Sequence, residues 1–298
     1  MLRLLLLGGT GRLGSAVLRT AGLRLDVAVR APGRGELDLE MLTPDQAASA
    51  VDPALVDVVL NCAAAAHVDR CETARDQAFA LNAAAPGILA NACADADVPF
   101  VHISTDYVFG GDGPGPFDED AVRAPAQRYG ETKAEGEARV LAAGGRRTVV
   151  RVSWLFGPEA QPYERFVLGQ VPTGAVRVMT DCASRPTWIP GLAEWLISVC
   201  GALAEGAFAP SVLHPAGGPM ATRGQWARAI LDARGHPDVP VLDQGPMPPG
   251  LATRPTDSRL ETTKTDAWIE ATWASASPTS RSAPRIDDWR DAVRAHGD

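Results

Sequence analysis

Tyr129 and Lys133 are residue types that could act together in acid-base chemistry, and they lie one helical turn apart. They stand four residues apart in AQRYGETKAEGE, so on a helix their side chains lie on one face. A free phenol has a pKa of about 10 and is a poor acid-base group at neutral pH unless a nearby cation stabilises the phenolate. Lys133 can supply that cation. The alternative is an ordinary solvated helix face.

A second group of reactive side chains follows an apolar run. HISTDYVFGG places Ser104, Thr105, Asp106 and Tyr107 where a strand is expected to end. Ligands of open α/β sheets bind outside the carboxyl ends of the strands, so we expect these side chains beside a substrate. Tyr129 can then protonate a carbonyl oxygen as hydride arrives at the carbon, while Thr105 hydrogen-bonds the same oxygen.

A glycine-rich turn directly follows the first apolar run. LLLLGGTGRLG has the spacing of a dinucleotide-binding loop, in which glycines permit a tight turn and let a pyrophosphate approach the first N–H groups of a helix. A purely structural turn is the alternative. The residues expected to bind the cofactor here are Gly8, Thr10, Gly11, Arg12, Leu13 and Gly14.

The end of the second expected strand bears on cofactor choice. A carboxylate there selects NAD, whereas an arginine accommodates the 2′-phosphate of NADP. VAVRAPGR offers Arg30 and Arg34, which favours NADPH over NADH, although both could be surface arginines. Asp38 is either a contact on the adenine side or a turn residue, and Leu39 is assigned to the same part of the cofactor site.

Small residues follow the third expected strand. VLNCAAAAHVD puts Ala63, Ala64 and Ala65 where backbone would pass beside the nicotinamide ribose, although an alanine-rich helix start explains the segment nearly as well. Asn82 has a poor propensity for the helix expected around it, which indicates a buried hydrogen-bonding role. It is assigned to the cofactor site with these alanines, and so are Tyr129 and Lys133.

The order of elements predicts a Rossmann-type, doubly wound parallel α/β sheet with a smaller C-terminal substrate-binding domain. Apolar runs alternate with helical patterns, among them a helix over 76–94. Residues 1–155 are assigned to the dinucleotide-binding domain and 156–298 mainly to the substrate-binding domain, with some segments returning to the first. The expected strands are 2–7, 25–29, 56–62, 98–104 and 147–153.

The second half is richer in proline, which shortens elements. A helix is expected over 191–206, ended by glycine. A second begins after Thr222, which can act as its N-cap. The polar stretch 274–284 predicts a loop before a last helix within 285–296.

Composition narrows the class of protein. The chain has 298 residues, 46% hydrophobic and 21% charged, a formal net charge of -8 and five scattered cysteines. The acidic balance predicts no nucleic-acid partner. No apolar run reaches the roughly 20 residues of a membrane span. The cysteine pattern predicts neither a disulfide framework nor a metal site, and favours the cytoplasm.

Two further residues are candidates for substrate contact. The histidines are dispersed, and we expect most of them to be polar residues hydrogen-bonded within the protein rather than ligands. His67 lies just past an expected strand end and could contact the substrate. Trp154 directly follows the fifth expected strand, where its ring could pack on a sugar or a base.

Taken together, these motifs resemble the extended short-chain dehydrogenase/reductases, and within them the dTDP-4-dehydrorhamnose reductase family. GGTGRLG, VVLNCAAAAHVDRCE, ALNAAAPGILANAC, VHISTDYVFGG, YGETKAEGE, RVSWLFG, SRPTWIPGLA and RPTDSRLETTK appear in the family's order over nearly the whole chain. The resemblance implies reduction of the C4 ketone of a dTDP-4-keto-6-deoxyhexose with NADPH or NADH.

The resemblance also implies roles for residues. Thr105, Tyr129 and Lys133 match the family's catalytic triad. The segments that hold the sugar nucleotide in the family contain here Asp106, Tyr107, Trp154, Arg185 and Arg254. Two arginines suit a diphosphate, because guanidinium groups pair with phosphate oxygens.

The chain also departs from the family's pattern, at Ala65, Ala66, His67, Arg185 and Trp188. These positions bear on the identity of the sugar. An epimerase or dehydratase of the same fold, and a catalytically silent NADP-binding regulatory subunit, are the alternative functions. No metal is expected, and a homodimer formed through a helix face stays open.

Overall fold

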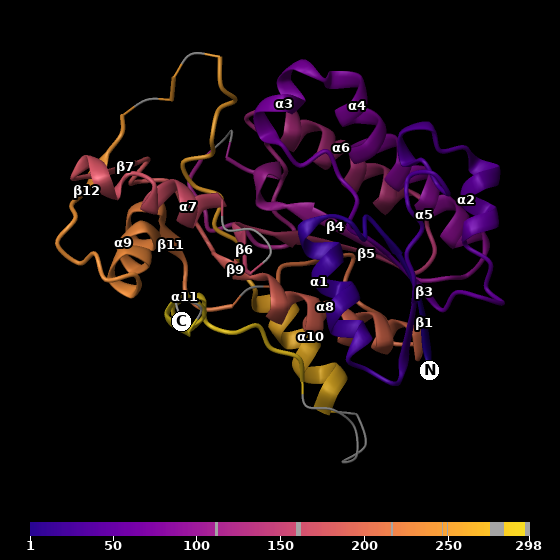
Figure 1. Ribbon diagram of the computed structural model, residues 1–298. Coiled ribbons are helices and arrows are strands. Elements are labelled where there is room, and N and C mark those ends of the chain that lie inside the picture. The colour runs from indigo at the N-terminus through magenta and orange to yellow at the C-terminus, as the bar shows by residue number, and fades with distance from the viewer. Residues whose placement is uncertain are drawn as a thin grey trace.

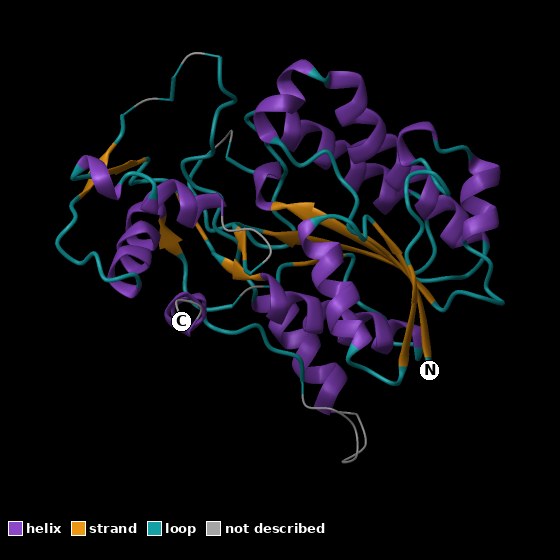
Figure 2. Ribbon diagram, in the orientation of Figure 1, coloured by secondary structure: helices purple, strands orange, loops and turns teal. Residues whose placement is uncertain are grey.

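A six-stranded parallel sheet lies at the centre of the computed structural model (Figure 2). Its strand order is β10-β5-β4-β3-β1-β2, so the direction of winding reverses between β1 and β3. The strands are β1 (Leu2–Leu7), β2 (Val27–Arg30), β3 (Val58–Asn61), β4 (Phe100–Thr105), β5 (Arg147–Val152) and β10 (Val212–Leu213). The structure describes residues 1–110, 113–158, 162–215, 217–245, 247–248, 250–274 and 283–295.

Helices cover both faces of this sheet (Figure 1). On β1, Leu4 and Leu6 join the core beneath one layer, while Leu5 and Leu7 join the core beneath the other. A strand that is buried on both sides reads as an unbroken apolar run, which explains LRLLLL. The first layer contains α1 (Arg12–Gly22), α8 (Ile189–Ala204) and α10 (Thr263–Ala274); the second contains α2 (Pro44–Ala50), α5 (Ala85–Asp95) and α6 (Arg128–Ala142), with α3 (Val68–Thr73) and α4 (Arg75–Phe79) beside α6. The predicted doubly wound fold is confirmed.

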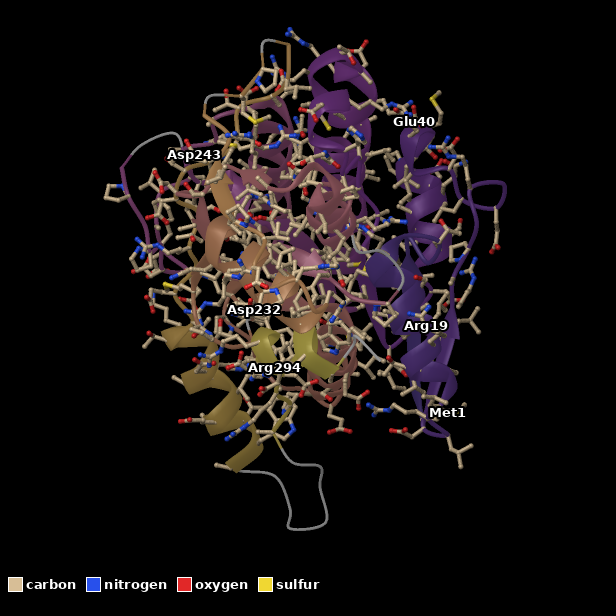
Figure 3. The ribbon with its side chains drawn as sticks, turned by 60° about the vertical axis from the view of Figure 1, so that its left-hand side comes forward. Met1, Arg19, Glu40, Asp232, Asp243 and Arg294 are labelled. Atoms are coloured by element: carbon tan, nitrogen blue, oxygen red, sulfur yellow. The ribbon has the colours of Figure 1, made fainter. Side chains whose placement is uncertain are left out.

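The later part of the chain forms a smaller body beside the sheet, with a core of its own. Figure 3 shows Asp232, Asp243 and Arg294 in this body and Met1, Arg19 and Glu40 on the opposite side, in the half that contains β1. The elements of the smaller body are β6 (Leu155–Phe156), α7 (Pro162–Leu168), β7 (Val176–Val178), β8 (Ala183–Ser184), β9 (Thr187–Trp188), β11 (Ala221–Thr222), α9 (Arg223–Ala233), β12 (Val241–Asp243) and α11 (Trp289–Ala295). The pairs β6–β9, β7–β12 and β8–β11 hydrogen-bond as small two-stranded sheets.

Single-turn segments complete the described elements: η1 (Leu39–Met41), η2 (Ala80–Ala84), η3 (Asp106–Val108) and η4 (Val171–Thr173). The helix predicted over 76–94 is divided, because α4 passes through η2, a π-helical turn, into α5. Thr222 caps α9 as predicted, in a reciprocal pair with Gln225. Most of the loop predicted at 274–284 lies outside the described residues. Among the helices described, none combines the length and apolar character that crossing a membrane requires.

Candidate active site

The glycine turn joins β1 to α1 and admits no side chain at two of its positions. Gly8 has φ +79°, and a Cβ there would lie 2.6 Å from the backbone nitrogen of Ala63. A Cβ on Gly14 would lie 2.2 Å from the carbonyl oxygen of Gly8. Gly11 is the N-cap of α1 and provides no side-chain hydrogen bond. The first N–H groups of this helix are therefore free to meet an anion.

A cavity of about 340 Å³ lies beside this turn. Among the predicted cofactor residues, it is lined by Gly8, Thr10, Gly11, Asp38, Leu39, Ala63 and Ala64. Arg34 also lines this cavity, and its guanidinium forms an ion pair with the carboxylate of Glu40 (N–O distance 2.7 Å). Arg30 does not line the cavity, and its guanidinium pairs with Glu36 at 2.9 Å. Of Arg30, at the end of β2, and Arg34, in the loop that follows, Arg34 is therefore the one placed to meet a ligand here.

The loop after β3 is held in place by Asn82. This buried side chain accepts a hydrogen bond from the backbone N–H of Ala65 (2.8 Å) and donates to the carbonyl oxygen of Ala65 (3.1 Å) and to Thr132 Oγ1 (3.1 Å). The buried hydrogen-bonding role predicted for Asn82 is present. It positions the backbone of Ala65 rather than offering a free amide to a ligand.

A second cavity of about 320 Å³ continues from the first, because Gly11, Cys62 and Ala64 line both. It brings together residues that are far apart in the sequence. Predicted residues that line it are Gly11, Arg12, Leu13, Ala64, Thr105, Asp106, Tyr107, Tyr129, Lys133 and Trp154. The catalytic candidates therefore face one continuous cleft with the glycine turn.

Asp106 is the most heavily hydrogen-bonded acid of the cleft. Its carboxylate accepts from Thr105 Oγ1 (3.1 Å), Ser184 Oγ (2.8 Å) and Ser258 Oγ (2.6 Å). Burial raises the pKa of Asp106 to about 6, against the effect of these hydroxyl groups. The carboxylate thus ties the end of β4 to β8 and to the segment around residue 258. Its predicted contact with substrate stays a prediction.

Tyr129 lies on the first turn of α6 and meets Tyr107 edge to face, with ring centroids 6.0 Å apart. Burial raises the pKa of the Tyr129 phenol, and a hydrogen bond with Thr105 opposes this rise. The phenol is therefore fully protonated at neutral pH, as a proton donor must be.

Lys133 is 1% exposed and lies on the same face of α6. Its Nζ donates to the carbonyl oxygen of Ile103 at 2.6 Å and lies 3.2 Å from His102 Nε2. Burial lowers the pKa of Lys133 to about 8, while Glu137 and Cys62 act in the other direction. The amine is directed toward β4 in this structure.

The far wall of the cleft contains a cation that the sequence did not reveal. Trp154 follows β5 with φ +42°, a left-handed conformation that is strained for a large side chain. Its ring stacks on Trp226, and the Arg223 guanidinium lies 4.5 Å from the Trp154 ring centroid and 4.9 Å from that of Tyr163. No carboxylate among the described residues forms an ion pair with Arg223.

Two polar groups that line the cavity lack hydrogen-bond partners within the described chain. They are Ser104 Oγ, on β4, and Trp226 Nε1, on α9. Ser104 stands in the motif that predicted the site. Arg223, Tyr163 and Trp226 were missed because their positions, on α7 and α9, reach the cleft only through the packing of the smaller body.

Three predicted substrate residues have other partners in this structure and do not line the cavity. His67 is the N-cap of α3, and its Nδ1 accepts from the backbone N–H of Arg70. Arg254 makes a two-pronged ion pair with Asp69, at 2.9 and 2.8 Å. Arg185 donates to the carbonyl oxygen of Gly218. Their contact with substrate stays a prediction.

Comparisons with known proteins agree with this arrangement. The profile of the RmlD substrate-binding domain family matches residues 2–279. The chain is 35% identical over 248 residues to dTDP-4-dehydrorhamnose reductase of Mycolicibacterium smegmatis, which covers 80% of this chain and 69% of that protein. It is 38% identical over 201 residues to a probable dTDP-4,6-dihydroxy-2-methyloxan-3-one 4-ketoreductase of Streptomyces antibioticus, covering 66% and 67% of the two chains.

A solved structure has the same fold. The dTDP-4-dehydrorhamnose reductase of Bacillus anthracis, crystallised in complex with NADP, superimposes with a TM-score of 0.78 at 22% identity, over 99% of this chain and 98% of that one. The family match over nearly the whole chain and the identity to the mycobacterial enzyme confirm the resemblance found in the motifs. The protein belongs to the dTDP-4-dehydrorhamnose reductase family of NAD(P)H-dependent oxidoreductases.

Proposed function

We propose that this protein uses NADPH to reduce the C4 ketone of a nucleotide-linked 4-keto-6-deoxyhexose, with dTDP as the nucleotide and Tyr129 as the proton donor. The observation that carries the proposal is the shared cleft. Thr105, Tyr129 and Lys133 line a cavity that continues into the one beside the glycine turn. The three relatives described above are named for reactions of dTDP-linked sugars, which supports this class of substrate.

The cleft has the features that NADPH requires. The tight backbone at Gly8 and Gly14 leaves the start of α1 bare, which suits a pyrophosphate. Arg34 lines the cavity beyond it and can pair with a 2′-phosphate. Bound there, NADPH supplies the hydride. Ala63 and Ala64 would lie against the cofactor without obstructing it.

The residues of the second cavity supply the rest of the reaction. Tyr129 holds its proton at neutral pH and releases it to the carbonyl oxygen as negative charge develops there. Thr105 donates its one hydroxyl proton to Asp106 in this structure and would turn it to the same carbonyl oxygen when the ketone binds. Lys133 in its charged form stabilises the phenolate that remains. Arg223, on the wall formed with Trp154 and Tyr163, is the cation that would meet the diphosphate of the nucleotide, whereas Arg12 and Lys133 line the cavity elsewhere.

The test is the loss of NADPH absorbance with a panel of dTDP-4-keto-6-deoxyhexoses, each assayed with and without a C3/C5-epimerase. We expect turnover with at least one sugar, and we expect Tyr129→Phe to reduce kcat by about 10²–10⁴-fold with unchanged NADPH affinity. Tyr163→Phe is the matched control. It removes a phenol of the same cavity, but one whose proton is already donated to the carbonyl oxygen of Arg223 at 2.7 Å.

Other outcomes would point to the alternatives. Tight NADPH binding without turnover on any sugar would favour a different ketone or a silent regulatory subunit. Conversion of a nucleotide sugar without net oxidation of NADPH would favour an epimerase or a dehydratase, because those enzymes recycle their bound cofactor.

A further inference from the structure

A row of three buried side chains ends at the catalytic lysine. Asn61, at the end of β3, accepts a hydrogen bond from the backbone N–H of Ala63 through Oδ1 at 3.0 Å. Its Nδ2 lies 3.2 Å from His102 Nδ1, and His102 Nε2 lies 3.2 Å from Lys133 Nζ. The side chains of Asn61, His102 and Lys133 are each no more than 1% exposed. They therefore hydrogen-bond to one another and to the backbone rather than to bulk water.

The backbone contact decides which way each hydrogen bond runs. Because Ala63 N–H needs an acceptor, Asn61 must present Oδ1 to it and direct Nδ2 toward His102. An amide nitrogen only donates, so His102 Nδ1 must accept. Burial and the neighbouring Lys133 lower the pKa of His102, so the ring is neutral and carries one proton. That proton is then on Nε2, which faces Lys133.

An Nε2–H group pointing at an amine requires a lone pair on that amine. An ammonium group has three donors and no acceptor, so a charged Lys133 would oppose N–H to N–H. We propose that His102 is a positioning residue that favours the neutral amine of Lys133 over its ammonium form in the cofactor-free protein. The neutral amine accepts from His102 Nε2–H and donates to the carbonyl oxygen of Ile103, at 2.6 Å.

The other groups that face Lys133 also leave its ammonium form poorly stabilised. Cys62, after β3, is a neutral thiol because burial raises its pKa to about 12. Glu137, one turn later on α6, has its carboxylate engaged by Arg151 at 2.8 Å and Arg123 at 3.3 Å. Tyr129, on the preceding turn, has its pKa raised by burial. The nearest carboxylate is thus already paired, and burial lowers the pKa of Lys133 to about 8.

The charge state has a consequence for turnover, which rests on the proposed function. Below pH about 8 Lys133 binds a proton and becomes the cation that stabilises the Tyr129 phenolate; above that pH the cation is lost. The profile of kcat/KM for NADPH, which reports groups of the free enzyme, should therefore fall as the pH rises through about 8.

The protonation of the Lys133 amine can be measured directly, because Lys133 and Lys264 are the only two lysines of the chain. In the Lys264→Arg variant, lysine labelled with ¹³C at Cε gives one signal, and its titration by NMR reports Lys133 alone. We expect a midpoint near pH 8 without cofactor. The two-bond ¹H–¹⁵N pattern of the histidine rings should show His102 as the Nε2–H tautomer, unchanged across the neutral range.

Asn61→Asp tests the origin of that charge state. A carboxylate accepts from Ala63 N–H and also from His102, which moves the imidazole proton to Nδ1 and turns Nε2 into an acceptor for the ammonium. The midpoint of Lys133 should rise by at least about one pKa unit, and the high-pH limb of kcat/KM should move with it. In the His102→Phe background, the same substitution shifts the midpoint of Lys133 only through the charge of the new carboxylate. The difference between the two shifts is therefore the part transmitted through the His102 ring.

Two results would overturn the inference. One is an Nδ1–H tautomer of His102 in the unaltered protein, or a Lys133 midpoint at the ordinary value for lysine. The other is an equal shift from Asn61→Asp with and without His102. These NMR readouts need neither substrate nor turnover, so a failure of the proposed function would leave them intact, and their failure would leave the reductase assay intact.

Discussion

The two ends of the cleft are built in different ways. The end beside the glycine turn is lined only by residues between 7 and 81, with glycines and alanines at the turn and after β3. The end beside Tyr129 includes large and charged side chains that come from β4, α6, the strand end of β5, α7 and α9. One end is therefore local in the sequence, whereas the other depends on how the smaller body packs against the sheet.

Because of this difference, the two ends of the cleft should tolerate different kinds of substitution. At the glycine turn the ligand would meet backbone, so the space left by missing side chains is what matters. At the far wall it would meet the Arg223 guanidinium, held between the rings of Trp154 and Tyr163. Adding one methyl group should damage the first end most, and removing one charge should damage the second.

The largest effect is expected from Gly14→Ala. The added Cβ would lie 2.2 Å from the carbonyl oxygen of Gly8, so α1 must shift away from the turn. NADPH affinity should fall at least about 100-fold, or ~3 kcal/mol, as measured by fluorescence titration. Gly22→Ala is the control at the other end of α1, where a Cβ meets no atom within 4 Å. Equal losses in the two variants would show that helix stability, rather than the turn, governs binding.

A smaller effect of a different kind is expected from Arg223→Met, which keeps much of the apolar stem but removes the charge. If the guanidinium meets a diphosphate, KM for the nucleotide sugar should rise about 10- to 100-fold, because a hydrogen bond to a charged group contributes ~1.5–3 kcal/mol. NADPH affinity should not change. Steady-state kinetics and competition by free dTDP measure both.

Arg165→Met is the matched control for this variant, because Arg165 is an exposed arginine on α7. An unchanged inhibition constant for dTDP in Arg223→Met would assign the diphosphate to another cation. Arg185 or Arg254 would then become the first candidates again, although both have protein partners in this structure.

The same difference explains how far the sequence could be interpreted. LRLLLL predicted a strand buried on both faces, and the turn that follows it could be assigned from glycine spacing alone, since both signals are local. That Thr105, Tyr129 and Lys133 line one cavity could also be expected, because the end of a strand and one turn of a helix fix their positions; their catalytic roles stay a prediction. The assignment of residues 1–155 and 156–298 to two domains stays a prediction.

What the sequence could not predict depends on contacts between distant segments. Thr222 was recognised as a cap, yet nothing local indicated that the next residue, Arg223, reaches the cleft. Asp106 was read as a substrate residue from its position, whereas its carboxylate accepts hydroxyl protons from Ser184 and Ser258, 78 and 152 positions away. Arg254 was read as a diphosphate ligand, and its pairing with Asp69 spans 185 positions.

The smallest effect tests the cofactor end of the cleft, where Arg30 ends β2 and Arg34 lies in the loop that follows. Arg34→Leu should reduce the preference for NADPH over NADH by no more than about tenfold, because an exposed ion pair with a phosphate contributes only ~1 kcal/mol. Arg30→Leu should change it by less than about twofold, since its guanidinium pairs with Glu36 and does not line the cavity. The measurement is kcat/KM for both cofactors in both variants. A larger loss in Arg30→Leu would mean that the 2′-phosphate lies against β2 itself, and that Arg30 exchanges Glu36 for the phosphate when NADPH binds.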